Sequence, residues 1–325
     1  MRIRATAAVA VVSGALALTA AVIPAAQATG TSSAQDGWAA AHRLAAGTAR
    51  SAATTFGART SGTAAEPASG QPYQLAVAFS NVKVDSGKPA VVVGTTNTVH
   101  VPYSFTLTAT DVDVSADDFI AGVDLYRGSA TDPANDLYGD NAPTCTVTSS
   151  TSSSTGVVTV ESCKGTIDIY PREDLTLSDP GTGWHSVAWA VALNGQDGDN
   201  PDESKIGEAD HTGLAAPALQ RYSTLTVNAA PEPVKKGATV TITGKLSRAN
   251  WDTHVYAGYT GQSVKLQFRK KTSSTYTTLK TLKTDSHGNL KTTYKASVDG
   301  YWRYTFAGTS TTPAATAAGD YVDVK

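Results

Sequence analysis

The sequence predicts an all-β protein built from two sandwich modules in tandem. Residues 99–108 and 240–246 alternate apolar and polar side chains with a period of two, which is typical of half-buried strands. Gly, Pro, Asn and Asp bound such runs after Tyr73. Ser, Thr, Gly, Val and Ala are abundant, whereas the chain has one Met and 17% charged residues. This composition favours extracellular β-rich modules over helical bundles.

The first 28 residues are typical of a cleavable export signal. Arg2 and Arg4 supply positive charge, residues 5–23 are almost entirely apolar or small, and the small-residue site 26–28 follows Pro24. This order predicts a signal peptide over residues 1–28, cleaved after Ala28. A transmembrane anchor is the alternative, because the apolar run approaches spanning length. No later segment is comparably apolar, so we expect a secreted, extracellular protein.

Residues 29–71 are predicted to form a disordered tail. They are rich in Ala, Ser, Thr and Gly and contain few side chains that could fill a core. Such a segment buries too little apolar surface to offset its loss of conformational entropy. Its role as a spacer or as a pro-region stays open.

The first sandwich is expected to contain a disulfide across a hairpin. Cys145 and Cys163 flank the turn-rich residues 149–156, with β-prone runs on both sides. A hairpin folded at Ser154 places the two cysteines opposite each other, which predicts a Cys145–Cys163 bridge in an oxidising compartment. Two free buried thiols are the alternative.

The two halves of the mature chain resemble each other. Residues 79–85 match residues 222–228, and a Gly-aromatic strand lies near the end of each half, at 183–189 and at 300–306. Either a duplication or the general strand order of sandwiches explains this likeness. Short strands between turns predict an immunoglobulin-like sandwich in residues 72–221 and another in residues 222–325. Tyr301 is expected to serve as the corner tyrosine of a late strand.

Charge separates the two modules. Residues 71–222 contain 7 Lys and Arg against 20 Asp and Glu, a formal charge of −13. Residues 223–325 contain 14 Lys and Arg against 6 Asp and Glu, a formal charge of +8. The near-neutral total of −2 therefore conceals an acidic module joined to a basic one, an asymmetry that bears on association with partners.

The basic module is a candidate surface for an anionic polymer. Arg269, Lys270 and Lys271 enter a predicted exposed turn. Aromatic residues interleave with the basic ones: Trp251, Tyr256, Tyr259, Phe268, Tyr276, Tyr294, Tyr301, Trp302 and Tyr304. Such a surface could hold an anionic cell-wall polymer, with nucleic acid a weaker candidate. Solvated strand faces over ordinary core aromatics are the alternative.

The acidic module contains a candidate calcium loop. Oxygen-bearing side chains crowd one short segment that also contains two glycines: Asn194, Asp197, Asp199, Asp202 and Glu203. Ca²⁺ takes six to eight oxygen ligands from a flexible loop. The spacing differs from that of an EF-hand, and a polar hairpin tip is the alternative. A second acidic cluster comprises Asp111, Asp113, Asp117 and Asp118.

Catalytic motifs are lacking in the sequence. It has no G-x-S-x-G, H-E-x-x-H, P-loop or dinucleotide-binding pattern, and its six His residues are scattered. The S-x-x-K pattern at residues 80–83 lies in a predicted strand without its partner motifs. We therefore expect a non-enzymatic protein without a required cofactor, Ca²⁺ being the one candidate. An enzyme acting on a wall polymer is the disfavoured alternative.

Several segments resemble a known group of proteins. They are residues 79–84, 125–128, 226–233, 260–269 and 299–303. On these segments the chain is similar to secreted streptomycete proteins with tandem immunoglobulin-like domains, some of which are labelled calcium-binding. The resemblance covers nearly the whole mature chain after the tail, and it implies export and a sandwich fold. It implies no active-site residues.

Overall fold

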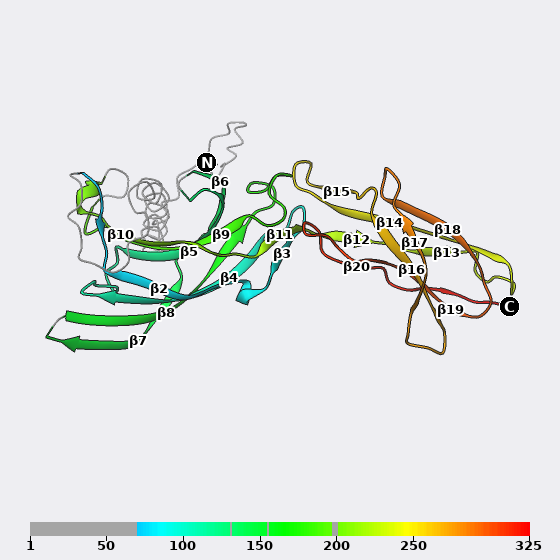
Figure 1. Cartoon of the computed structure of the whole chain (residues 1–325), viewed down its shortest axis with the longest axis horizontal. Coiled ribbons are helices and arrows are strands. Elements are labelled where there is room, and N and C mark those ends of the chain that lie inside the picture. Colours follow the sequence, from blue (N-terminus) through cyan, green and yellow to red (C-terminus); the bar gives the residue numbers. More distant parts are fainter. Residues whose placement is uncertain (1–69, 131, 155, 197–200) are drawn as a thin grey trace, which may run out of the picture.

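The computed structural model describes residues 70–130, 132–154, 156–196 and 201–325. The predicted signal peptide and nearly all of the predicted tail lie outside this part of the chain. Within it, the regular elements are strands and two short 3₁₀ turns, η1 (Asp85–Gly87) and η2 (Glu203–Lys205), so the all-β prediction is confirmed. No helix among these residues is long and apolar enough to cross a membrane. Two sandwiches lie end to end (Figure 1).

The first sandwich packs two antiparallel sheets against each other. One sheet has the order β2-β4-β8-β7, with β2 (Val77–Val84), β4 (Val99–Thr110), β8 (Gly156–Ile169) and β7 (Thr144–Ser153). The other has the order β1-β10-β9-β5-β6, with β1 (Tyr73–Gln74), β10 (Gly207–Ala215), β9 (Trp184–Ala192), β5 (Phe119–Gly128) and β6 (Pro133–Leu137). Among the described strands of these two sheets, β1 alone joins its neighbour in parallel. These orders correspond to the ABED and CFG sheets of an immunoglobulin fold, with β1 and β6 added at the two edges of the second sheet.

Strand β4 shows why the sequence forms this sandwich. Its buried residues alternate with more exposed ones, and the buried set is Val101, Tyr103, Phe105, Leu107 and Ala109. A period of two places them all on one face of the sheet. That face forms the core of the first sandwich with residues of the opposite sheet, such as Val123 and Leu125 of β5.

The second sandwich repeats this arrangement. In one sheet, β14 (Thr239–Asn250) pairs with β12 (Ser223–Leu225), β13 (Asn228–Ala230), β15 (Val255–Gly258) and β18 (Asn289–Lys295). The other sheet has the order β17-β16-β19, with β17 (Thr277–Lys283), β16 (Ser263–Lys270) and β19 (Gly300–Phe306), and β19 also pairs with β20 (Ala315–Thr316) and β21 (Asp320–Val322). The Tyr304 hydroxyl crosses the core and donates a 3.1 Å hydrogen bond to the carbonyl oxygen of Ile242.

The sandwiches meet through a very short connection. Strand β11 (Ala218–Arg221) pairs in parallel with β3 (Ala90–Val93) of the first sandwich, and only Tyr222 separates β11 from β12 of the second. Trp251 of the second sandwich is fully buried and packs in the core cluster of the first. It therefore does not lie on the basic surface, contrary to the prediction. The division into domains at residues 221 and 222 stays a prediction.

Candidate functional site

One face of the second sandwich carries an ordered set of cationic and aromatic side chains. Arg269 of β16 pairs with Tyr301 of β19, and Gln267 pairs with Arg303. In β19, Trp302, Tyr304 and Phe306 are buried, so Tyr301 and Arg303 face outward by strand alternation. Tyr321 of β21 pairs with Tyr301 on its other side. The outer face of this sheet therefore collects arginines and tyrosines from three strands.

These side chains stack into a continuous ladder. The guanidinium carbon of Arg303 lies 3.7 Å from the ring centroid of Tyr276, and that of Arg269 lies 3.8 Å from the ring centroid of Tyr301. Arg269 also lies 5.4 Å from Tyr276, and the rings of Tyr301 and Tyr321 are 5.1 Å apart. We name this set the arginine–tyrosine ladder: Arg303, Tyr276, Arg269, Tyr301, Tyr321 and, 5.3 Å from the Tyr321 ring, Lys271.

Hydrogen bonds hold the cationic groups of the ladder in place. Arg303 Nε donates to Gln267 Oε1 at 2.8 Å, and an Nη of Arg269 donates to the carbonyl oxygen of Ser273 at 2.9 Å. A hydrogen bond with Tyr321 and the nearby carboxylate of Asp299 raise the pKa of Lys271, so it stays charged. The arginines keep further N–H groups for a ligand, because a guanidinium has five donors.

The three consecutive cationic residues predicted to bind a polymer, Arg269, Lys270 and Lys271, do not all lie on one face of the sheet. Arg269 and Lys271 belong to the ladder, whereas alternation along β16 places the exposed Lys270 on the opposite face. The expectation that Tyr301 is a corner tyrosine was wrong, because its ring lies in the ladder on the outer face. Tyr321 is not among the predicted site residues, because it follows the last turn of the chain without a strong strand pattern.

The predicted calcium loop is described only in part. Asp197 and Asp199 lie outside the described residues. The Asn194 amide donates to Tyr73 Oη at 2.7 Å and to the carbonyl oxygen of Lys205 at 2.8 Å, so its NH₂ group joins the start of the loop to β1 and η2. Asp202 accepts from Ser204 Oγ at 2.6 Å and pairs with Lys205 at 3.2 Å, which lowers its pKa, and Glu203 begins η2.

One residue of the other acidic cluster reaches this loop. Asp118 Oδ2 accepts a 2.7 Å hydrogen bond from the backbone N–H of Gly195, and the backbone N–H of Leu193 donates to the carbonyl oxygen of Asp118. Asp118 therefore lies beside the start of this loop, which is far from it in sequence. No local sequence pattern predicts this contact.

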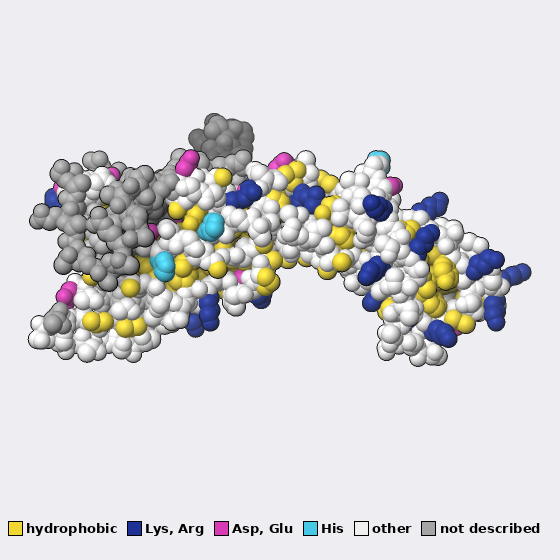
Figure 2. All heavy atoms as spheres, in the orientation of Figure 1, with side chains coloured by type: hydrophobic (Ala, Val, Ile, Leu, Met, Phe, Trp, Pro, Cys, Tyr) yellow, Lys and Arg dark blue, Asp and Glu magenta, His cyan; other side chains and the backbone are white. Residues whose placement is uncertain are grey.

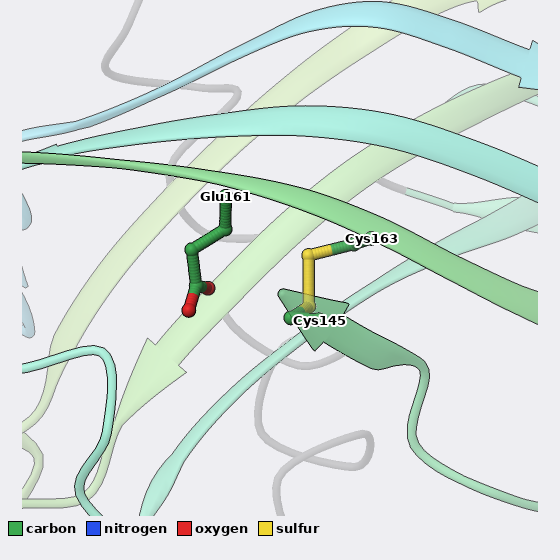
Figure 3. Close-up of side chains that lie close together, drawn as sticks. All are labelled: Cys145, Glu161 and Cys163. Atoms are coloured by element: carbon green, nitrogen blue, oxygen red, sulfur yellow. A yellow bond between two sulfur atoms is a disulfide. The ribbon is translucent and has the colours of Figure 1, made fainter. Parts of the chain in front are cut away.

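The predicted disulfide is confirmed. Cys145 and Cys163 face each other across the β7–β8 hairpin and form a bridge. Glu161 lies on the same face of β8, and its carboxylate lies close to the bridge (Figure 3), with the three side-chain ligand atoms within 4.8 Å of one another. Burial raises the pKa of Glu161. Because both sulfurs belong to the bridge, only one carboxylate there could bind a metal.

Comparisons with known proteins give the following results. No family model and no curated protein matches the sequence. The full ectodomain (Ig1-Ig3) of mouse nectin-like molecule 4 matches at 13% identity and TM-score 0.21 over 75% of this chain and 63% of that one. Titin domains A168-A170 match at 9% identity and TM-score 0.20, over 75% of this chain and 66% of that chain. The T6 backbone pilin of serotype M6 Streptococcus pyogenes matches at 10% identity and TM-score 0.18, over 76% of this chain and 52% of that chain.

The chain thus spans between about half and two thirds of the length of these three chains. Overall superposition at these TM-scores is poor, so the immunoglobulin-like description rests on the strand order of the two sandwiches.

Proposed function

We propose that this chain is a secreted, non-enzymatic binding protein whose basic sandwich attaches to an anionic extracellular polymer, such as one of the cell wall. The arginine–tyrosine ladder carries this proposal. Its guanidinium groups are held by stacking and by hydrogen bonds before a ligand arrives, so little side-chain entropy is lost on binding. The planar donors of arginine match the oxygens of phosphate and carboxylate groups.

The charge distribution supports the same proposal. The basic module has a formal charge of +8, and Lys and Arg side chains gather on it in the space-filling view (Figure 2). Long-range attraction brings a polyanion to this module, and the ladder then supplies fixed donors and aromatic faces. The acidic module repels the same polymer, so attachment is confined to one end of the molecule.

Export is part of the proposal. The predicted signal peptide over residues 1–28 directs secretion, and the Cys145–Cys163 bridge suits an oxidising compartment. The resemblance to secreted streptomycete proteins implies the same location. Mass spectrometry of the culture medium tests this, with a mature N-terminus directly after Ala28 expected and an N-terminus at Met1 contradicting it.

Binding to a purified anionic wall polymer, at low and high salt, tests the function itself. The double variant Arg269→Gln with Arg303→Gln should weaken binding by at least about tenfold, because it removes charge-assisted hydrogen bonds. The matched control is Lys245→Gln with Lys291→Gln, which removes the same charge from exposed positions on the opposite sheet. Equal losses in both double variants, or binding that does not weaken with salt, would contradict the ladder as the site.

Calcium binding by loop 194–203 is a second candidate function. The observation that favours it is the contact of Asp118 with this loop, which adds a carboxylate to the acidic segment. Calorimetric titration with Ca²⁺ tests it in the wild type and in the variant Asp197→Asn with Asp199→Asn. Heat and a higher melting temperature only in the wild type are expected. The absence of both in the wild type would end this hypothesis.

A further inference from the structure

Two arginines meet where the sandwiches join. Arg221 ends β11, and Ser223, two residues later, pairs with Arg248 of β14. Residues two apart in an extended chain lie on the same side, so this register brings the Arg221 and Arg248 side chains together. Arg221 is only 7% exposed, and its buried Nε has no hydrogen-bond partner among the described residues.

No carboxylate among the described residues forms an ion pair with the guanidinium groups of Arg221 and Arg248. The Arg248 guanidinium lies 3.7 Å from the ring centroid of Tyr259 and donates weakly, at 3.4 Å, to the buried Thr312 Oγ1. Asp252 attracts Arg221, but it lies on the surface and its Oδ1 accepts a 3.0 Å hydrogen bond from the backbone N–H of Leu177.

Both arginines are charged at neutral pH. Burial and the neighbouring Arg248 charge lower the pKa of Arg221 to about 10, which is still well above 7. Burial also lowers the pKa of Arg248. Two like charges that are removed from water without a carboxylate between them repel each other and lack hydrogen-bond acceptors. An anion bound between them would offset the repulsion between the two charges and would accept hydrogen bonds from both guanidinium groups.

We propose that the junction of the two sandwiches binds a small oxyanion of the phosphate or sulfate class between Arg221 and Arg248. A tetrahedral oxyanion presents several acceptors, so it can take N–H groups from two guanidinium forks at once. The buried hydroxyl of Thr312 lies beside Arg248 and offers a further donor. This site lies at the junction and shares no residue with the arginine–tyrosine ladder.

A bound anion would contact residues that belong to both sandwiches. Arg221 belongs to the strand that pairs with β3 of the first sandwich, whereas Arg248 belongs to β14 of the second. The backbone N–H of Arg221 also donates to the carbonyl oxygen of Thr311, in the loop after β19. A bound anion therefore ties together elements of both sandwiches and should stiffen the connection between them.

Inorganic phosphate is the probe for this proposal. Melting temperatures are measured for the mature chain in phosphate and in chloride at equal ionic strength and pH. We expect phosphate to raise the wild-type melting temperature by roughly 2–4 °C at concentrations a few times the dissociation constant. The variants Arg221→Gln and Arg248→Gln should lose this increase. General salt effects cancel because variants and wild type are compared in the same buffers.

Control variants separate this site from the proposed function. Arg269→Gln with Arg303→Gln should keep the phosphate-dependent increase, because those residues lie in the ladder. In chloride, Arg221→Gln should melt no lower than the wild type, because the substitution relieves a like-charge repulsion. Calorimetry should give one phosphate site per wild-type chain. An equal phosphate effect in the wild type, Arg221→Gln and Arg248→Gln, or no effect in the wild type, would overturn the proposal.

Discussion

The indole N–H of Trp251 donates a 2.9 Å hydrogen bond to the carbonyl oxygen of Gly94, which links the second sandwich to the first. Trp251 is fully buried, and its ring packs with core residues of the first sandwich. Tyr222 N–H donates to the carbonyl oxygen of Val93 nearby, and Ala249 N–H donates to that of Tyr222. The junction is therefore a packed, hydrogen-bonded interface.

Replacing Trp251 with alanine should destabilise the junction strongly. The substitution removes a buried ring and leaves a cavity, so we expect a loss of about 3–5 kcal/mol in the free energy of unfolding. Denaturant unfolding measures the loss. Trp251→Phe keeps most of the ring and removes the N–H, so its loss should be smaller. A Trp251→Ala protein as stable as the wild type would show that the ring does not support the interface.

Removal of the Cys145–Cys163 bridge should lower stability mainly through the unfolded chain. The bridge closes a short hairpin loop, so its loss should cost about 3 kcal/mol in the chain-entropy model. Urea unfolding with and without reductant gives this value. A Cys145→Ala with Cys163→Ala variant should match the reduced wild type and should not respond to reductant. A reductant effect in that variant would point to another cause.

Glu161 should make the protein less stable as pH rises. Burial raises its pKa in the folded state above the ordinary value of 4.5, so the folded protein holds the proton more tightly than the unfolded chain does. The stability from this proton is complete below the ordinary pKa and is lost as pH rises through the folded pKa. Glu161→Gln should therefore melt higher than the wild type at pH 7, and the difference should vanish near pH 3.

Asp113 provides a control of opposite sign for this pH series. Hydrogen bonds from Ser115 lower its pKa, so its contribution to stability is present above the ordinary pKa and is lost as pH falls through the folded value. Asp113→Asn should be slightly less stable than the wild type at pH 7. A Glu161→Gln variant that behaves like Asp113→Asn would contradict the effect of burial.

Tyr276 should be needed for polymer binding and dispensable for folding. It contacts both Arg303 and Arg269, and exposed cation–π contacts contribute about 0.5–1 kcal/mol each, so Tyr276→Ala should weaken binding by roughly fivefold to thirtyfold. Tyr276→Phe keeps the ring and should bind like the wild type. Binding is measured on immobilised polymer, and melting curves check folding. Unchanged binding by folded Tyr276→Ala would remove the ring from the site.

Short-range sequence patterns, namely apolar–polar alternation and clusters of turn residues, predicted much of this fold. Alternation identified β4 and β14 because a strand exposes every second side chain, and the turn-rich segment between Cys145 and Cys163 fixed the hairpin that bridges them. These signals depend on residues close together in sequence, and the side-chain period of a strand is independent of its distant neighbours.

The candidate sites needed long-range information. Trp251 packs into a sandwich that ends about thirty residues before it, so its neighbours in sequence do not indicate its burial. Tyr276 enters the ladder because the turn after β16 folds back over the outer face, and Tyr321 joins it through pairing of β21 with β19. Cross-strand register and turn conformation decide these contacts.

The end-to-end arrangement of an acidic and a basic sandwich (Figure 1) gives the molecule an electric dipole along its long axis. Near a negatively charged layer, the field draws the basic end inward and pushes the acidic end outward. The short, packed junction keeps the two ends from folding onto each other. A molecule of this kind would stand upright on such a layer and present its acidic sandwich to the medium.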